Sequence, residues 1–298
     1  MTEELLEPDD LGKLQELVKY KGADRVVHFT DFLLDKANSK SNKRFVSGFS
    51  SLENKIQGIE AGEVVVITGH TKAGKTLFAE SWIHGMTKRD PEARAVIFSF
   101  EVQTEKLLIK YQKSGLDLPI YVPLRLETMS FDWLYSRCLE AKLKFNCRII
   151  LIDHLHFLVD MNTKQNMSLN IGAFMRRLKK DIALDLDLAV ILIAHQGQPK
   201  DKQEASLANM RDSSFIGQES DSTIVVTRRK NMDNIEIQDY SINYPDVNEL
   251  LLFPPAGSSD DDQYSANLAI VKVEVHRRTG VYDWKKLFKK SGDFMEEI

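Results

Sequence analysis

The sequence predicts an α/β fold built on a mainly parallel sheet flanked by helices. Short apolar runs alternate with stretches that have helical spacing, which is the pattern of a sheet covered by helices. The runs are apolar throughout rather than at every second residue, so each strand is expected to be buried on both faces. One run leads into GHTKAGKT at 69–76, which fits the phosphate-loop pattern G-x-x-x-x-G-K-[ST].

Composition places the chain among ordinary globular proteins. It has 298 residues, a net charge of −4, 43% hydrophobic residues and 28% charged residues. The acidic start lacks a secretion signal, and no apolar run approaches the roughly 20 residues that span a bilayer. Cys138 and Cys147 lack metal-type spacing and indicate reduced thiols. We expect an intracellular protein, in the cytoplasm or nucleoid of a bacterium or virus-infected cell, with an organelle not excluded and no membrane partner.

Residues 1–43 are expected to form an N-terminal arm, followed by one large domain over 44–298. Apolar residues at helical spacing predict a helix at 10–20, and the polar stretch at 36–44 resembles a linker. The helix has two open interpretations, which are packing on its own domain or docking on a neighbouring subunit.

The elements of the large domain follow in order. Strands are expected at 63–69, 94–101, 147–159, 188–196, 222–229 and 266–278. Helices are expected at 76–88, 104–115 and 168–187. An acidic insertion at about 231–265 interrupts the series.

The phosphate loop predicts nucleotide binding. Its glycines let the backbone approach phosphate oxygens, and the N-terminus of the following helix attracts anions. Lys75 is expected to reach the β- and γ-phosphates, and Thr76 to bind Mg²⁺. The expected nucleotide-binding residues are Gly69, His70, Thr71, Lys72, Ala73, Gly74, Lys75 and Thr76.

Polar side chains end three of the predicted strands. Asp153 is placed where a Mg²⁺-binding carboxylate belongs, and Glu101 is placed to act as the general base for the attacking water. His195 and Gln196 are candidate sensors of the γ-phosphate, and a buried structural histidine is the competing interpretation. All of them follow the carboxyl ends of strands, where open α/β sheets bind ligands.

Six ordered stretches resemble the hexameric replicative helicases of the DnaB type, and most closely the branch with the helicase domain of phage primase-helicases and Twinkle. They are FVSGFSSLENKIQGIEAGEVVVITGHTKAGKT, VIFSFEVQTEKL, IILIDHLHFL, VILIAHQ, MRDSSFIGQESDSTIVVTRRK and VKVEVHRRTG. The resemblance covers about residues 45–290. It implies a RecA-like core and a ring of subunits that binds ATP, or another NTP, with Mg²⁺ between neighbours.

The resemblance also assigns roles to residues outside the phosphate loop. An arginine from the next subunit would reach the γ-phosphate; Arg277 fits the phage-type spacing, which we prefer, and Arg278 the bacterial spacing. The family's lysine is replaced by Val275 or His276, depending on the spacing. The single-stranded DNA loop would contain Arg211, Asp212, Ser213 and Ser214, and Ser214 stands where the family often has glycine. The implied partners are a homo-oligomer, single-stranded DNA, and a primase, polymerase or helicase loader.

Two other functions share the same motifs. A RecA- or RadA-like recombination ATPase would use the same core in open filaments. A nucleotide-gated DNA-binding regulator without unwinding activity would explain the replaced lysine and the acidic insertion, whereas Glu101, Asp153 and the arginine pair favour an active enzyme.

Overall fold

The computed structural model describes residues 18–19, 21, 26–31, 43–113, 118–128, 130–159, 167–195, 214–228 and 268–298. The chain divides into two units, Met1–Lys43 and Arg44–Ile298, and the elements below belong to the second unit. The expected helix at 10–20 lies mostly outside the described residues, and the acidic insertion at 231–265 lies wholly outside them.

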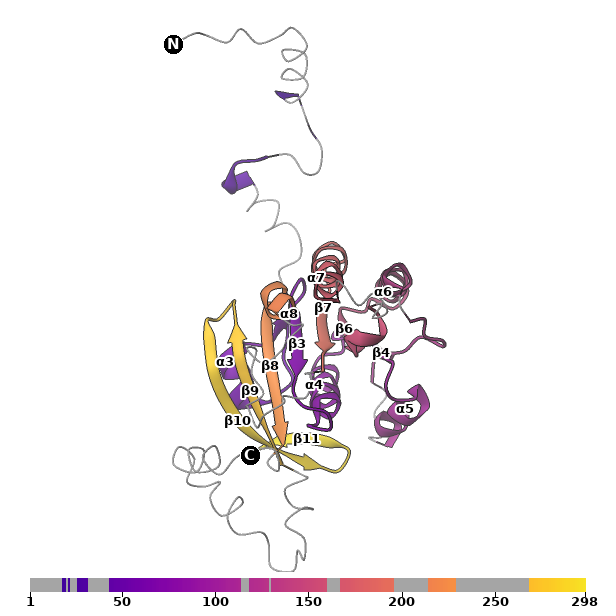
Figure 1. Cartoon of the computed structure of the whole chain (residues 1–298), viewed down its shortest axis with the longest axis vertical. Helices are drawn as coiled ribbons and strands as arrows, with labels where there is room; N and C mark the ends of the chain where they lie inside the picture. The colour runs from indigo at the N-terminus through magenta and orange to yellow at the C-terminus, as the bar shows by residue number, and fades with distance from the viewer. Residues whose placement is uncertain are drawn as a thin grey trace, which may run out of the picture. The chain divides into compact units, whose positions relative to one another are not determined.

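A nine-stranded sheet organises the described part of the second unit, in the order β11-β10-β9-β8-β3-β7-β6-β4-β5 (Figure 1). The six strands from β5 to β8 in that order are parallel. The small β1 and β2 pair separately. The bounds are β1 Arg44–Phe45, β2 Ile59–Glu60, β3 Val64–Thr68, β4 Ala95–Ser99, β5 Ile120–Tyr121, β6 Ile149–Asp153, β7 Ala189–Ile193, β8 Ser222–Arg228, β9 Leu268–His276, β10 Val281–Ser291 and β11 Phe294–Glu297.

Helices cover both faces of the parallel strands (Figure 1). Alternate residues of β3 point to opposite faces, so Val65 packs in the core that contains α4 and Val64 in the core that contains α6 and α7. The main helices are α3 Ser50–Ile56, α4 Lys75–Arg89, α5 Thr104–Lys113, α6 Phe131–Phe145, α7 Met167–Arg177 and α8 Ser214–Glu219. A π-helical segment, Leu178–Leu184, continues α7. None of the helices in the described ranges has the length and apolar character needed to cross a membrane.

The strand order creates a switch point beside β3. The chain passes from β3 across the positions of β7 and β6 to reach β4, and later returns across β3 from β7 to β8. Connections therefore leave the carboxyl end of β3 and of its neighbour β7 in opposite directions along the sheet. Ligands of open α/β sheets bind in the crevice at such a point.

The structure differs from the expected strands in two places. The strand expected over 147–159 ends at Asp153, because His154 caps a 3₁₀ turn at Leu155–Phe157. The last expected strand, β9, runs antiparallel to β8, and the unexpected β10 and β11 extend this antiparallel edge. Antiparallel neighbours need no crossover helix, and the short turn at 277–280 is enough to join β9 to β10. Helix α6 was also not expected from the sequence.

Candidate functional site

The phosphate loop connects β3 to α4 at the carboxyl edge of the sheet. Gly74 precedes the first residue of α4 with a φ of 97°, a left-handed conformation that favours glycine. Gly69 has a φ of 143°, and a Cβ atom there would lie 2.1 Å from the carbonyl oxygen of Val226 on the neighbouring β8. The loop therefore packs against β8 so closely that only glycine fits at residue 69.

Lys75 is the first residue of α4 and is only 4% exposed. Its ammonium group donates to the carbonyl oxygens of Gly69 at 3.0 Å and His70 at 2.8 Å, so the side chain folds back over its own loop. Burial lowers the pKa of Lys75 to about 8, while the charges of Glu101 and Asp153 act in the opposite direction. The lysine is thus held inside the loop, next to two carboxylates.

Thr76 and Asp153 meet across the loop. The Thr76 hydroxyl donates to Oδ2 of Asp153 at 2.9 Å, and Asp153 is 1% exposed. Burial raises the pKa of Asp153 to about 7; the bond from Thr76 lowers it, and the charges of Glu101 and Glu80 raise it further.

The second Asp153 oxygen, Oδ1, is buried and has no hydrogen-bond partner among the described residues. A hard cation such as Mg²⁺ prefers oxygen ligands, so a hydroxyl and an under-satisfied carboxylate fit this metal.

Glu101, His154 and His195 gather beside Asp153. Glu101 is 46% exposed, and its Oε2 lies 3.4 Å from Nε2 of His195. The rings of His154 and His195 meet edge to face with centroids 4.2 Å apart. These residues follow β4, β6 and β7, which are adjacent in the sheet. The expected row of strand-end side chains therefore forms one cluster, with Glu101 partly open to solvent.

Burial keeps the two imidazoles of this cluster neutral. It lowers the pKa of His154 to about 3, with further lowering by His195, His156 and Lys75. The pKa of His195 is also lowered by burial and by Lys75, against a raising effect of Glu101. A neutral His195 can accept or donate one hydrogen bond at each ring nitrogen, as a phosphate sensor or a partner of Glu101 requires.

The two candidate arginines lie at the opposite edge of the sheet. Arg277 follows the last residue of β9, and His276 pairs with Ser222, which in turn pairs with Val65 near the start of β3. The Arg277 side chain is exposed and donates to the carbonyl oxygen of Gln218. Arg278 is turned inward, and its Nε lies 2.7 Å from Oε1 of Glu63.

Other expected site residues are not placed. Gln196, Arg211, Asp212 and Ser213 lie outside the described residues, and Ser214 is described only as the first residue of α8. Conversely, the structure places three residues at the site that were not expected there. His154 follows Asp153 directly, a position that could have signalled its role. Glu80 is buried on α4 near Asp153, and Met295 packs against Gly74, a contact with no local sequence signal.

Comparisons with known proteins agree with this geometry. The model of the DnaB-like helicase C-terminal domain matches residues 45–118 and 112–253. The replicative DNA helicase DnaB of Mycoplasma pneumoniae is 21% identical over 249 residues, which are 71% of this chain and 52% of that protein. The chain thus spans about half the length of this curated relative.

Two solved structures share the fold. The ATPase domain of a phage helicase has a TM-score of 0.64 at 17% identity, covering 91% of this chain and 97% of that one. A structure of a DnaB-like replicative helicase and its interactions with primase has a TM-score of 0.63 at 17% identity, covering 96% and 71%. These likenesses confirm the predicted RecA-like α/β fold. The chain belongs to the family of the DnaB-like helicase C-terminal domain.

Proposed function

We propose that this chain is an ATP-dependent, ring-forming DNA helicase that translocates on single-stranded DNA and unwinds duplex during replication. The observation that carries the proposal is the separation of the expected catalytic groups. Lys75, Glu101 and Asp153 lie at the carboxyl edge of the sheet, and the exposed Arg277 lies at the amino edge. The length of β3 with its flanking residues separates the two edges by roughly 20 Å, which exceeds the reach of an arginine side chain.

This separation supports a site shared between two copies of the chain. Arg277 is too far from its own phosphate loop to contact a bound nucleotide, but it is free to face the loop of a neighbour. An interface that joins one edge to the opposite edge of the next copy is heterologous, and repeated it closes into a ring. A hexamer follows from the family, and six equivalent interfaces would give six shared sites.

Each group has a role in hydrolysis of ATP or another NTP. Lys75 holds the β- and γ-phosphates once they displace the loop carbonyls that it now contacts. Mg²⁺ bound by Thr76 and Asp153 supplies positive charge to the phosphate oxygens. Glu101 takes the proton of the attacking water, with His195 beside it to orient that water or contact the γ-phosphate. The neighbour's Arg277 stabilises the charge that develops during transfer.

The proposed DNA contacts rest on family resemblance. Arg211, Asp212, Ser213 and Ser214 would hold backbone phosphates of single-stranded DNA in the centre of the ring. Such contacts are independent of sequence, and the affinity they give falls as salt concentration rises. A primase, a polymerase or a helicase loader is the expected protein partner.

The test is strand displacement on a forked DNA duplex with ATP and Mg²⁺, together with ATPase activity with and without single-stranded DNA. We expect unwinding and DNA-stimulated turnover, both lost in Glu101→Gln, which preserves the size of the side chain but removes the base. A partly exposed glutamate far from the site, Glu140→Gln on α6, is the matched control and should retain both activities. Absence of both activities in the unmodified chain would refute the proposal.

A further inference from the structure

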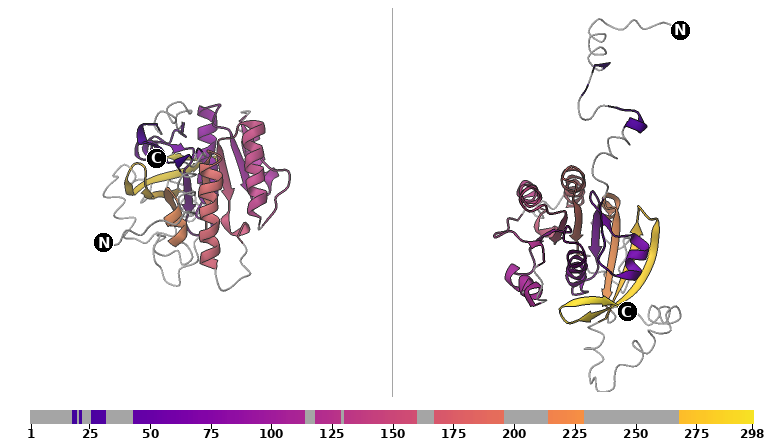
Figure 2. Two further views of the ribbon diagram at one scale, coloured as in Figure 1. Left: turned by 90° about the horizontal axis from the view of Figure 1, so that it is seen from above. Right: turned by 180° about the vertical axis from the view of Figure 1, so that it is seen from behind.

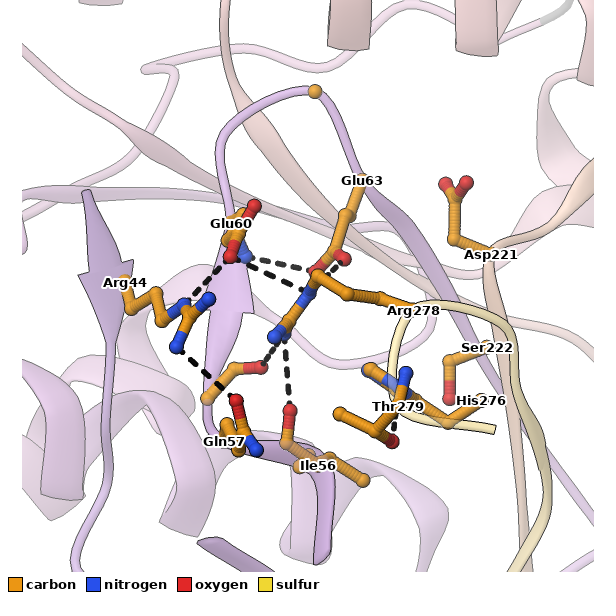
Figure 3. Close-up of polar contacts among 12 residues, drawn as sticks. Arg44, Ile56, Gln57, Glu60, Glu63, Asp221, Ser222, His276, Arg278 and Thr279 are labelled. Atoms are coloured by element: carbon orange, nitrogen blue, oxygen red, sulfur yellow. Dashed lines mark hydrogen bonds and ion pairs between the residues drawn. The ribbon is translucent and has the colours of Figure 1, made fainter. Parts of the chain in front are cut away.

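The turn at 277–280 contains two adjacent arginines in opposite environments. Arg277 is exposed, and its backbone N–H donates to the carbonyl oxygen of Asp221 at 2.9 Å. Arg278 has a side chain that is 20% exposed and points back into the same chain (Figure 3). An inward arginine at a surface turn suggests that its role is to hold the turn.

Arg278 uses its guanidinium to bind a carboxylate and two backbone carbonyls together. Nε donates to Oε1 of Glu63 at 2.7 Å and lies 3.4 Å from Oε1 of Glu60. Nη2 donates to the carbonyl oxygens of Ile56 at 3.0 Å and Gly58 at 2.7 Å (Figure 3). These acceptors lie at the end of α3, in β2 and just before β3, so one side chain ties the turn to the segment that leads into the phosphate-loop strand.

The acceptors of Arg278 are themselves fixed. The backbone N–H of Glu60 donates to Oε2 of Glu63 at 2.8 Å, and Arg44 binds the Glu60 carboxylate at 2.6 Å (Figure 3). Both glutamates are buried at less than 10% exposure. Arg278 therefore binds to a preformed acceptor site, and the planar fork of donors that this site matches is specific to arginine.

The other side of the turn is held independently. Asp221, which accepts from the Arg277 backbone, also accepts from the backbone of Val64 at 2.7 Å and from Lys179 at 2.6 Å. The Gly280 N–H donates to the carbonyl oxygen of His276 at 2.9 Å, which closes the turn. The backbone of Arg277 is thus fixed on the Asp221 side, and Arg278 is the anchor on the Glu63 side.

We infer that Arg278 is a positioning residue: its bonds to Glu63, Ile56 and Gly58 hold the turn so that Arg277 faces the nucleotide of the neighbouring subunit. The inference rests on the proposed function, because it requires Arg277 to act in trans. It assigns the two arginines different roles, so that one reaches across the interface and the other fixes the direction of that reach.

The test is a double-mutant cycle measured by single-turnover release of labelled phosphate from ATP, which resolves slow rates. We expect Arg278→Gln to lower kcat at least tenfold, with KM for ATP changed less than about threefold, since the nucleotide-binding loop is untouched. In an Arg277→Ala background, Arg278→Gln should cause no further loss, because it acts only through Arg277. Arg44→Gln removes another arginine from the same Glu60 carboxylate and should leave kcat within about twofold of the unmodified chain.

The outcomes separate the two claims. If Arg277→Ala keeps its ATPase activity, the shared site of the proposed function is wrong, whatever Arg278 does. If Arg277→Ala loses activity while Arg278→Gln keeps it, or lowers it equally in both backgrounds, the positioning role is overturned. Thermal melting checks that each variant folds. If Arg278→Gln does not fold, Glu63→Gln replaces it with the same expected and opposing results, because it weakens the anchor and retains a neutral acceptor.

Discussion

Asp153 lowers the stability of the chain when it is ionised without a metal. Its carboxyl is 1% exposed, and burial raises its pKa from 3.8 to about 7. Between these values the folded chain binds more protons at this residue than the unfolded chain does. The stability contributed by the protonated form is therefore fully present below pH 3.8 and is lost as the pH rises through about 7.

Asp153→Asn should stabilise the metal-free chain and abolish Mg²⁺-dependent hydrolysis. The amide keeps an acceptor for Thr76 but carries no buried charge. We expect the gain in unfolding free energy to approach about 4 kcal/mol at pH 8, at 1.4 kcal/mol per pKa unit, and to be much smaller at pH 5. Urea unfolding with EDTA at the two pH values measures it. Equal stability of the two proteins at pH 8 would contradict the strain assigned to Asp153.

Gly69 permits the close contact between the phosphate loop and β8. Gly69→Ala places a Cβ 2.1 Å from the Val226 carbonyl oxygen at a φ of +143°, so both backbone strain and a clash with main chain are introduced. Gly292→Ala is the matched control, since its φ is +60° but nothing lies within 4 Å. We expect Gly69→Ala to lose at least about 2 kcal/mol more unfolding free energy than Gly292→Ala. Similar losses in denaturant titrations would show that the loop relaxes away from β8.

At the scale of elements, the C-terminal hairpin of β10 and β11 supports the helices around the phosphate loop (Figure 2). The Met295 backbone N–H donates to the Ser81 hydroxyl on α4 at 2.8 Å. Glu297 accepts from the backbone N–H groups of Ser51 and Leu52, each at 2.9 Å, at the N-terminus of α3. A strand at the end of the sequence thus caps a helix near the beginning of the domain.

Glu297→Ala should destabilise the chain by roughly 1–2 kcal/mol, since two N–H groups at a helix N-terminus lose a charged acceptor. Glu296→Ala removes the neighbouring carboxylate of the same strand, which the exposed pattern of β11 places toward solvent. That control should change unfolding free energy by less than about 0.5 kcal/mol. Thermal unfolding compares the two variants. A loss in both, or in neither, would argue against the cap.

Elements with a complete local signal were predictable. The apolar runs of β3, β6 and β7 and the strand-end Asp153 and Glu101 follow from the sequence, because burial on both faces and the loop motif are local patterns. The direction of β9 depends on which neighbour it pairs with, which is a tertiary choice. The different environments of Arg277 and Arg278 were also unpredictable, because Glu63 lies 215 residues away from Arg278 in the sequence.

At the scale of the whole molecule, the separated site makes activity a property of an assembly. Glu101, Lys75 and Asp153 share one edge of the sheet, whereas Arg277 lies at the other. Damage to one edge should therefore leave the other edge of the same chain able to serve a neighbour. Two inactive chains with damage at different edges can then form a complete site between them, provided that the interface runs from edge to edge in one direction.

Mixing Glu101→Gln with Arg277→Ala should restore ATPase activity. In equal mixtures about one quarter of the interfaces combine the intact carboxylate edge of one chain with the intact arginine of the next, so the recovered rate should approach a quarter of the normal rate per site. Mixing Glu101→Gln with Lys75→Ala is the matched control. Both changes lie at the same edge, no interface is complete, and no activity should return. Phosphate release after subunit exchange measures both mixtures. Recovery in the control, or failure of the first mixture to recover although light scattering shows that it assembles, would place Arg277 and Glu101 in the same half of the site and exclude a site completed by a neighbour.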